Sequence, residues 1–136
     1  SKVFQGICSS NPRYYVDPSQ IVRLWYHENL RVFHDRLTTE EDRNYLKEIL
    51  NSQLPKFKMT ADQVMNSERL IFGDFMQRRE DEIKFYNQVS DLNTLLNRME
   101  NYLEEYNADS SMGGNRKQMK LVMFLDACEH IARICR

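Results

Sequence analysis

The densest group of side chains that could do chemistry lies in residues 24–37, LWYHENLRVFHDRL. His27-Glu28 begins like the HExxH helix of zinc proteases, which needs a second imidazole one turn later. Arg31 stands at that position, and its fixed positive charge would repel a metal ion. His34 shares a helix face with His27, but lies about 10 Å further along the axis at ~1.5 Å per residue. The spacing therefore favours a structural helix over a metal or hydrolytic site on His27, Glu28 and His34.

Two other candidate sites are also incomplete. Gly113-Gly114 precede Lys117, but a phosphate loop needs the spacing GxxxxGK followed by Ser or Thr. Cys128 and His130 are two residues apart, so one helix would place them on different faces and the histidine could not activate the thiol. We therefore predict no catalytic, cofactor-binding or metal-binding residue in this chain.

The composition is that of an ordinary globular protein. Apolar residues make up 41% of the chain and charged residues 29%, and the formal net charge is −1. This balance gives no electrostatic reason to expect nucleic acid or an anionic membrane as a partner. The longest apolar run, residues 121–125, is far shorter than the ~20 residues of a membrane-spanning helix. Three cysteines without a CxxC pair suit a reducing compartment, so we expect a cytoplasmic location.

Apolar residues recur at helical spacing along most of the chain, which predicts an all-α fold, a small helical bundle. Residues 1–8 are typical of the end of a helix. Asp17-Pro18 is a good helix start, and that helix is expected to run to about Leu37. Thr38-Thr39, followed by three acids, begins a second helix that ends at Pro55, so the two form a hairpin.

The second half of the chain is expected to be less regular at first. Residues 55–75 are predicted to be irregular or extended, and residues 76–84 to be charged, mostly solvated and partly helical. Ser90 is the expected cap of the next helix. A flexible loop is predicted over 107–118, and a final helix from near Lys117 to the end.

The helix of residues 18–37 should have one buried and one charged face. Its apolar stripe predicts a structural core of Trp25, Val32 and Phe33. Its acids and bases form a ladder at helical spacing, which favours a solvated face that contacts a neighbouring domain. The residues expected to make such contacts are His27, Glu28, Arg31 and Asp35.

The sequence pattern of a helix continues up to both ends of the chain. There is no initiator methionine, and the apolar pattern of the last helix continues to Arg136 without a glycine or proline. We therefore expect an internal fragment of a longer polypeptide.

A resemblance to dynein heavy chains is carried first by residues 24–43, LWYHENLRVFHDRLTTEEDR, which are similar to the small-domain helix pair of that family. The matching residues are Leu24-Trp25, His27-Glu28, Arg31-Val32-Phe33, Asp35-Arg36-Leu37 and Asp42-Arg43. Residues 3–7, VFQGI, resemble the preceding helix. Tyr106-Asn107 and residues 121–136, LVMFLDACEHIARICR, resemble the segment that leads into the next module. Three separated motifs in the family's order make the resemblance specific.

Dynein heavy chains carry a ring of six AAA+ ATPase modules. The resemblance implies that residues 1–65 form the helical lid of the third module, and residues 66–136 the linker and entry helices of the fourth. The sequence of the helix that contains His27-Glu28 resembles the axonemal branch of the family more than the cytoplasmic branch. The family's phosphate loop follows the last matching helix, and its nucleotide-sensing arginine precedes VFQGI, so no nucleotide-binding residue carries over to this chain.

The function implied by the resemblance is mechanical. The chain would be a non-catalytic helical fragment that relays nucleotide-dependent motion between AAA+ modules of an ATP-driven microtubule motor in the axoneme of cilia and flagella. ATP and Mg²⁺ would be cofactors of the parent only. The expected partners are neighbouring modules of the same chain, microtubules, and dynein intermediate and light chains. The alternative is a stand-alone helical adaptor that binds partner helices through exposed apolar stripes.

Overall fold

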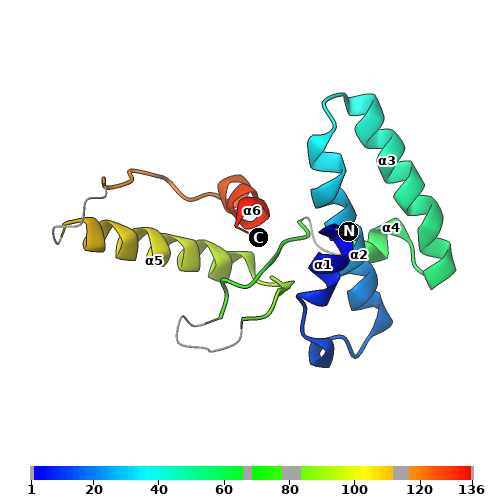
Figure 1. Cartoon of the computed structure of the whole chain (residues 1–136), viewed down its shortest axis with the longest axis horizontal. Coiled ribbons are helices and arrows are strands. Elements are labelled where there is room, and N and C mark those ends of the chain that lie inside the picture. The colour runs from blue at the N-terminus through cyan, green and yellow to red at the C-terminus, as the bar shows by residue number, and fades with distance from the viewer. Residues whose placement is uncertain (1, 66–68, 78–83, 112–116, 136) are drawn as a thin grey trace. The chain divides into compact units, whose positions relative to one another are not determined.

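The computed structural model describes residues 2–65, 69–77, 84–111 and 117–135, and it divides the chain into two compact units, Ser1–Gln88 and Val89–Arg136. The first unit contains α1 (Lys2–Cys8), α2 (Pro18–Val32), α3 (Glu40–Gln53), α4 (Ala61–Val64) and the strands β1 (Phe72–Gly73) and β2 (Asn87–Gln88). The second contains α5 (Leu92–Ser111) and α6 (Leu125–Ile134) (Figure 1). The predicted all-α class is confirmed, with a short antiparallel ribbon that the sequence did not reveal. Among the described residues, no helix combines the length and apolar character needed to cross a membrane.

Helix α2 starts where the sequence predicts. The Asp17 carboxylate accepts a hydrogen bond from the Ser19 backbone N–H at 3.0 Å, and Pro18 occupies the first helical position. Hydrogen bonds from the Ser19 side chain and backbone hold the pKa of Asp17 below its ordinary value. The regular helix ends at Val32, and a tighter turn, His34–Arg36, completes the length that the sequence assigned to it.

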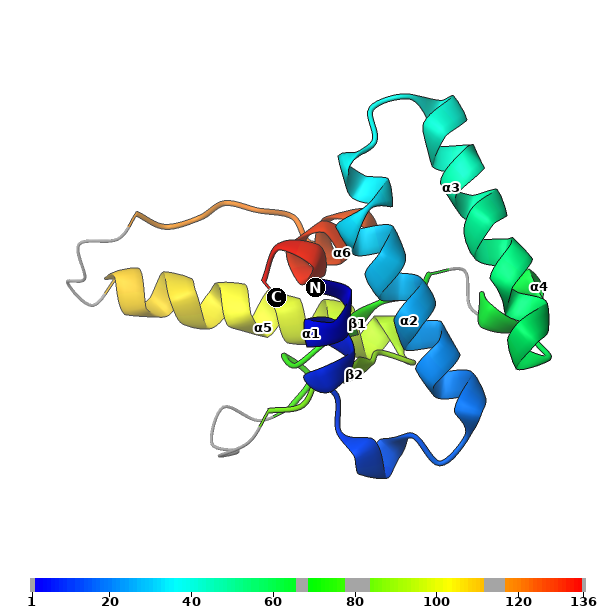
Figure 2. The ribbon, with the colours of Figure 1, turned by 45° about the vertical axis from the view of Figure 1, so that its right-hand side comes forward.

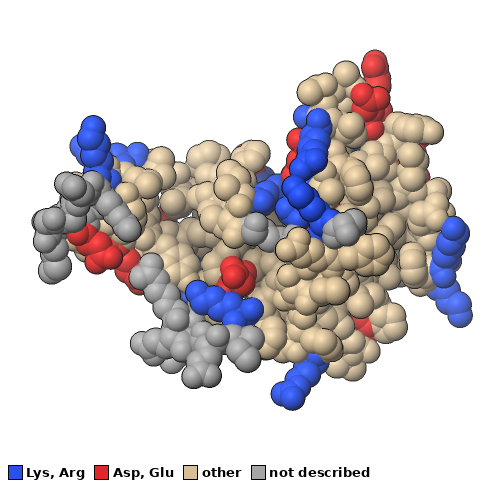
Figure 3. Space-filling model, viewed as in Figure 1, with Lys and Arg blue, Asp and Glu red and all other residues tan. Residues whose placement is uncertain are grey.

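Helix α3 also starts as predicted. The Thr39 hydroxyl accepts the Asp42 backbone N–H at 3.3 Å, and acids fill the first turn, where the helix dipole favours negative charge. Figure 3 shows the acidic side chains gathered at this end of the hairpin. The helix ends at Gln53, and Pro55 lies in the short turn Leu54–Phe57 that follows. The predicted stop at this proline is confirmed.

The core of the first unit gathers side chains from α2, the end of α3, α4 and the two ribbon segments. Its buried members are Val22, Leu24, Tyr26, Leu50, Leu54, Val64, Leu70, Phe72 and Tyr86. Helix α4 is fastened to α2, since the Arg23 guanidinium donates to the Gln63 carbonyl at 3.1 and 3.3 Å. Figure 2 shows the hairpin that α2 and α3 form in this unit. The core therefore packs this hairpin against Leu70, Phe72 and Tyr86 in one compact unit.

The face of α2 that the structure buries is not the face that the sequence predicted. Phe33, expected in the core, is 49% exposed. Trp25 and Val32 are only half-buried, and the Trp25 ring packs against Phe57 with centroids 6.0 Å apart. The prediction that Trp25, Val32 and Phe33 form the buried core of this helix is thus corrected, since none of the three is fully buried. The physical reason is that α1, Leu70, Phe72 and Tyr86 pack against the side of α2 that carries His27 and Glu28, and no pattern within α2 itself reports those neighbours.

Helix α5 differs from its prediction at both ends. Asp91, rather than Ser90, caps it, because its carboxylate accepts the backbone N–H groups of Asn93 and Thr94 at 3.0 and 3.2 Å. The hydrogen bonds from Thr94 hold the pKa of Asp91 below its ordinary value. The helix also continues through Ser111, into the stretch that was expected to be a loop.

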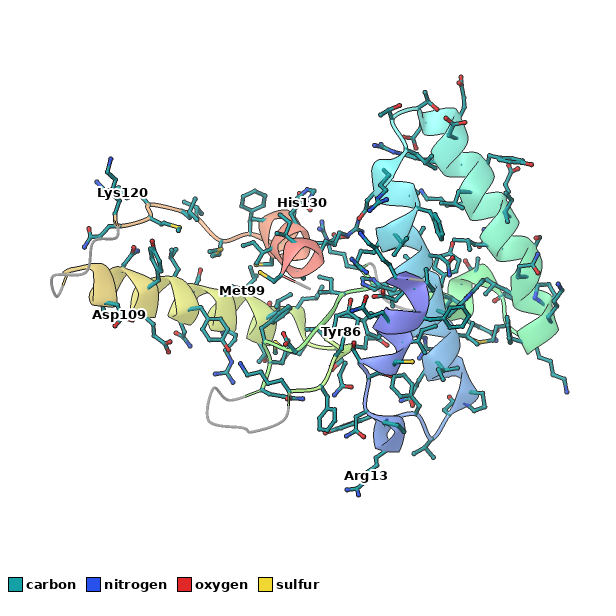
Figure 4. The ribbon with its side chains drawn as sticks, viewed as in Figure 1. Arg13, Tyr86, Met99, Asp109, Lys120 and His130 are labelled. Carbon is teal, nitrogen blue, oxygen red and sulfur yellow. The ribbon has the colours of Figure 1, made fainter. Side chains whose placement is uncertain are left out.

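Residues 117–124 form no helix, so the final helix begins at Leu125 and not near Lys117. The Asn107 side-chain amide explains this difference. It donates to the Met119 carbonyl at 2.9 Å and accepts the Met119 N–H at 2.7 Å, which ties the backbone of the segment to α5. In Figure 4, Met99 of α5 lies on the side facing α6, and both Met99 and Cys128 are buried.

Two predictions fall largely outside the described residues. Most of the charged stretch 76–84 and the glycine pair Gly113-Gly114 belong to ranges for which no structure is described. The predicted boundary between residues 65 and 66 separates two modules of the parent ring, and it stays a prediction. The observed division after residue 88 separates two compact units, which is a different property.

The Thr39 cap provides a local test of the hairpin. Thr39→Ala should lower the free energy of unfolding by about 1 kcal/mol, because the Asp42 N–H loses its acceptor. Chemical denaturation followed by circular dichroism measures the change. Thr38→Ala is the matched control, since Thr38 is exposed and precedes the cap. Equal losses from the two substitutions would contradict the capping role.

Candidate functional site

His27 is the best-connected polar residue of the first unit. It is 3% exposed, and both of its ring nitrogens are occupied. Nδ1 lies 2.9 Å from the Leu70 carbonyl oxygen, and Nε2 lies 3.1 Å from the Tyr86 hydroxyl. Because a carbonyl can only accept, Nδ1 carries the hydrogen, and in the neutral ring Nε2 accepts from Tyr86. This arrangement satisfies the whole imidazole.

Aromatic packing reinforces these hydrogen bonds. The His27 and Phe72 rings have centroids 4.8 Å apart, and the Phe72 and Tyr86 rings 5.9 Å apart. We call His27, Leu70, Phe72 and Tyr86 the His27 clamp. The Tyr86 backbone N–H also donates to the Ser9 carbonyl at 3.2 Å, so the clamp reaches the end of α1. Figure 4 labels Tyr86 beside the helices of the first unit.

Glu28 forms a second buried contact next to the clamp. Its side chain is fully buried, and Arg31 donates to both carboxylate oxygens, from Nη2 at 3.1 Å and from Nε at 3.4 Å. The carboxylate lies against α1 at Gly6, where an added Cβ would come within 2.0 Å of Glu28 Oε2. Only glycine leaves room for the acid at this point, so α1 and α2 approach closely around a paired charge.

The four residues predicted as an outer charged face are thus divided. His27 and Glu28 are buried within their own unit, which corrects their expected exposure, because Leu70, Phe72 and Tyr86 contact His27 and α1 lies against Glu28. Arg31 is half-buried on Glu28, and Asp35 is exposed with its carboxylate 3.6 Å from His34 Nδ1. Arg31 and Asp35 therefore remain the members of this set that could contact a neighbouring module.

The arrangement holds backbone segments together rather than activating a nucleophile or a metal. His27 has no ring nitrogen left for a base or a ligand, because both are engaged within the clamp. His34 lies elsewhere, and burial, followed by the charge of Lys47, lowers its pKa. Within the described part of the chain, no three His, Cys, Asp or Glu side chains gather as a metal site would require.

The cysteine candidate also has a structural setting. Cys128 is buried, and burial, followed by the charge of Glu100, raises the pKa of its thiol, which disfavours a nucleophilic thiolate. His130 is exposed and is labelled in Figure 4 on the outer side of α6, away from α5. The two side chains therefore lie on different faces, as their spacing predicted.

Sequence reasoning missed four members of this site, namely Leu70, Phe72, Tyr86 and Gly6. Tyr86 and Leu70 lie 59 and 43 residues from His27 along the chain, so no local pattern connects them to α2. Gly6 did carry a signal, because a glycine inside a helix has a cost that usually reflects a close approach.

Removal of the Tyr86 hydroxyl tests the clamp. Tyr86→Phe should lower the free energy of unfolding by roughly 1–3 kcal/mol, because the buried Nε2 of His27 loses its partner while the ring packing remains. Tyr45→Phe is the matched control, since Tyr45 is 65% exposed on α3. If both substitutions cost the same in urea denaturation, the hydrogen bond does not contribute.

A double-mutant cycle tests the contact of Gly6 with Glu28. Gly6→Ala should destabilise the chain by about 1–3 kcal/mol, because the new methyl group displaces the carboxylate from its ion pair, although alanine has the better helix propensity. In the Glu28→Ala background the same substitution should be neutral or stabilising. The same cost in both backgrounds would show that the two residues are not coupled.

Comparison with known proteins finds similar sequences for the whole chain. Residues 1–43 match the family model described as the dynein heavy chain ATPase lid domain. Over 136 residues, covering all of this chain, the chain is 40% identical to dynein axonemal heavy chain 1 of Mus musculus. It is 41% identical over 138 residues to dynein axonemal heavy chain 2 of Homo sapiens, and 38% identical over 152 residues to human dynein axonemal heavy chain 3.

The chain spans only 3 to 4% of the length of these relatives. The alignments nevertheless cover the chain from end to end, through both compact units. The predicted resemblance is therefore confirmed: the chain is homologous along its whole length to a segment of axonemal dynein heavy chains, and residues 1–43 carry the lid-domain sequence of that family.

Proposed function

We propose that this segment relays nucleotide-dependent motion between two AAA+ modules of a dynein motor ring, and that the His27 clamp is the connection. The supporting observation is its position. His27 lies inside the matched lid residues 1–43, whereas Leu70, Phe72 and Tyr86 lie beyond them. The clamp therefore fastens the lid helix α2 to the chain that follows the lid.

The contacts favour a rigid connection. Hydrogen bonds of 2.9 and 3.1 Å fix the imidazole at both nitrogens, and Phe72 packs on its face. Glu28, which pairs with Arg31, lies against α1 at Gly6. A rotation of α2 would thus carry Leu70 and Tyr86 with it, because sliding would leave buried polar groups unpaired.

The parent protein proposed here is an ATP-driven microtubule motor of the ciliary axoneme, as the names of the relatives suggest. The sequence of this chain has no phosphate loop, so we assign ATP and Mg²⁺ to other parts of the parent. The proposed partners are the adjacent modules of the same chain, with microtubules and dynein intermediate and light chains as partners of the parent.

The proposed place in the ring is the join between the third and fourth modules. In this proposal residues 1–65 are the lid of the third module, and residues 66–136 lead into the fourth. Arg31 and Asp35 are the proposed contacts with a neighbouring module, because parts of both side chains reach solvent at the end of α2.

The test uses the whole heavy chain that carries this segment. Tyr86→Phe should slow microtubule gliding several-fold while basal ATP hydrolysis is retained, because a loosened clamp weakens coupling without removing any nucleotide-binding group. Tyr45→Phe in the same heavy chain is the control. Gliding at the control speed, in a protein whose isolated segment is measurably destabilised by Tyr86→Phe, would refute the relay through the clamp.

A further inference from the structure

A hollow of about 310 Å³ opens in the first unit beside the β1–β2 ribbon. Its lining includes Phe72 of the His27 clamp but neither Leu70 nor Tyr86, the hydrogen-bond partners of His27. Aromatic rings supply much of its wall, namely Tyr14, Tyr15, Phe72 and Phe85. Side-chain amides supply the polar part, among them Gln20 and Asn87. Its volume is at the small end of the range for ligand pockets in proteins, enough for a single ring with a substituent.

Two of these amides have an unsatisfied oxygen. Gln20 Oε1 and Asn87 Oδ1 are buried and have no hydrogen-bond partner. Buried polar atoms are paired in the great majority of cases, because an unpaired one keeps its full desolvation cost. Gln77 in the same wall shows the usual situation, since its amide accepts the Phe85 N–H at 3.0 Å and donates to the Phe85 carbonyl at 3.4 Å. The amide oxygens of two residues that line one hollow therefore each lack a donor, although neither oxygen is open to the hollow as it stands.

The wall also limits the charge and shape of an occupant. None of the described lining residues is charged, so an ion would lose its hydration without gaining a counter-charge. The aromatic rings favour a flat apolar body that can stack or pack edge to face. An uncharged planar group with at least one N–H donor meets these conditions.

We propose that this hollow binds a small, flat, uncharged molecule that carries a primary carboxamide. The carboxamide is preferred over a simple donor because the terminal torsions of Gln and Asn are broad. In this proposal Gln20 or Asn87 turns about its terminal torsion, so that its covered amide oxygen, or the amide nitrogen in its place, faces the hollow. A carboxamide pairs with either group, since it has both a donor and an acceptor. The site does not depend on the motor role proposed above.

The same chemistry has two sources, a free aromatic amide and the side chain of an Asn or Gln on another polypeptide. Benzamide represents the first source and N-acetylglutamine amide the second. Tighter binding of one of them identifies the source, and either result supports a carboxamide site.

The experiment titrates the 136-residue chain with benzamide and follows side-chain amide resonances by NMR. The resonances of Gln20 and Asn87 should shift, with a Kd on the order of 1 mM for a ligand of this size. N,N-dimethylbenzamide keeps the ring but lacks the N–H donors, and it should bind about tenfold more weakly. Equal binding of the two compounds would overturn the carboxamide assignment. Absence of shifts from both benzamide and N-acetylglutamine amide, up to the solubility limit, would overturn the site itself.

Gln20→Leu separates binding from folding. It removes an unpaired buried oxygen, so stability should be unchanged or increased, whereas benzamide binding should weaken about tenfold. Gln5→Leu is the matched control, because Gln5 is exposed on α1 and does not line the hollow. If Gln20→Leu binds benzamide as well as the control does, Gln20 is not part of the site, and the same comparison with Asn87→Leu then decides whether any carboxamide contact remains. Unweakened binding in both variants overturns the proposal.

Discussion

A buried imidazole needs a partner for each of its nitrogens, and His27 obtains them from two places far along the chain, the Leu70 carbonyl and the Tyr86 hydroxyl. This requirement connects α2 to Leu70 and Tyr86 more specifically than apolar contact would, because hydrogen bonds fix distance and direction. The neighbouring residue, Glu28, imposes a similar condition on α1, where Gly6 leaves space for its carboxylate. Adjacent positions on α2 therefore determine where α1 and the ribbon lie.

Local signals in the sequence were sufficient to predict where the helices of the hairpin begin, but not which side of α2 is buried. Asp17 and Thr39 begin α2 and α3 as expected, because a cap bonds to its own first turn and the signal lies within a few residues. The buried side of α2 was missed, since its partners lie 43 and 59 residues away. A charged or polar residue on a helix is normally solvated, so His27 and Glu28 were assigned to the surface. Only tertiary contacts reveal that both are paired inside.

The same distinction explains the second unit. Ser90 and Asp91 are both residue types that commonly cap helices. The Asp91 carboxylate is the group that accepts the free N–H groups of the first turn, so α5 begins after Asp91. Residues 117–124 have apolar spacing compatible with a helix, but Asn107 pairs with both backbone groups of Met119, which are then not available for a helix. In each case a side-chain contact decided between alternatives that propensity left nearly equal.

The ribbon that connects these features cannot be stable by itself. Each strand has two residues, and even a longer isolated hairpin is only marginally stable in water. Its stability must come from packing, above all from Phe72, which contacts His27 and Tyr86 in the clamp and also lines the hollow. Neighbouring residues along an extended chain point to opposite sides, which places Tyr86 in the clamp and Asn87 at the hollow. The clamp thus organises the wall of the hollow as well as the contact of α2 with Leu70 and Tyr86.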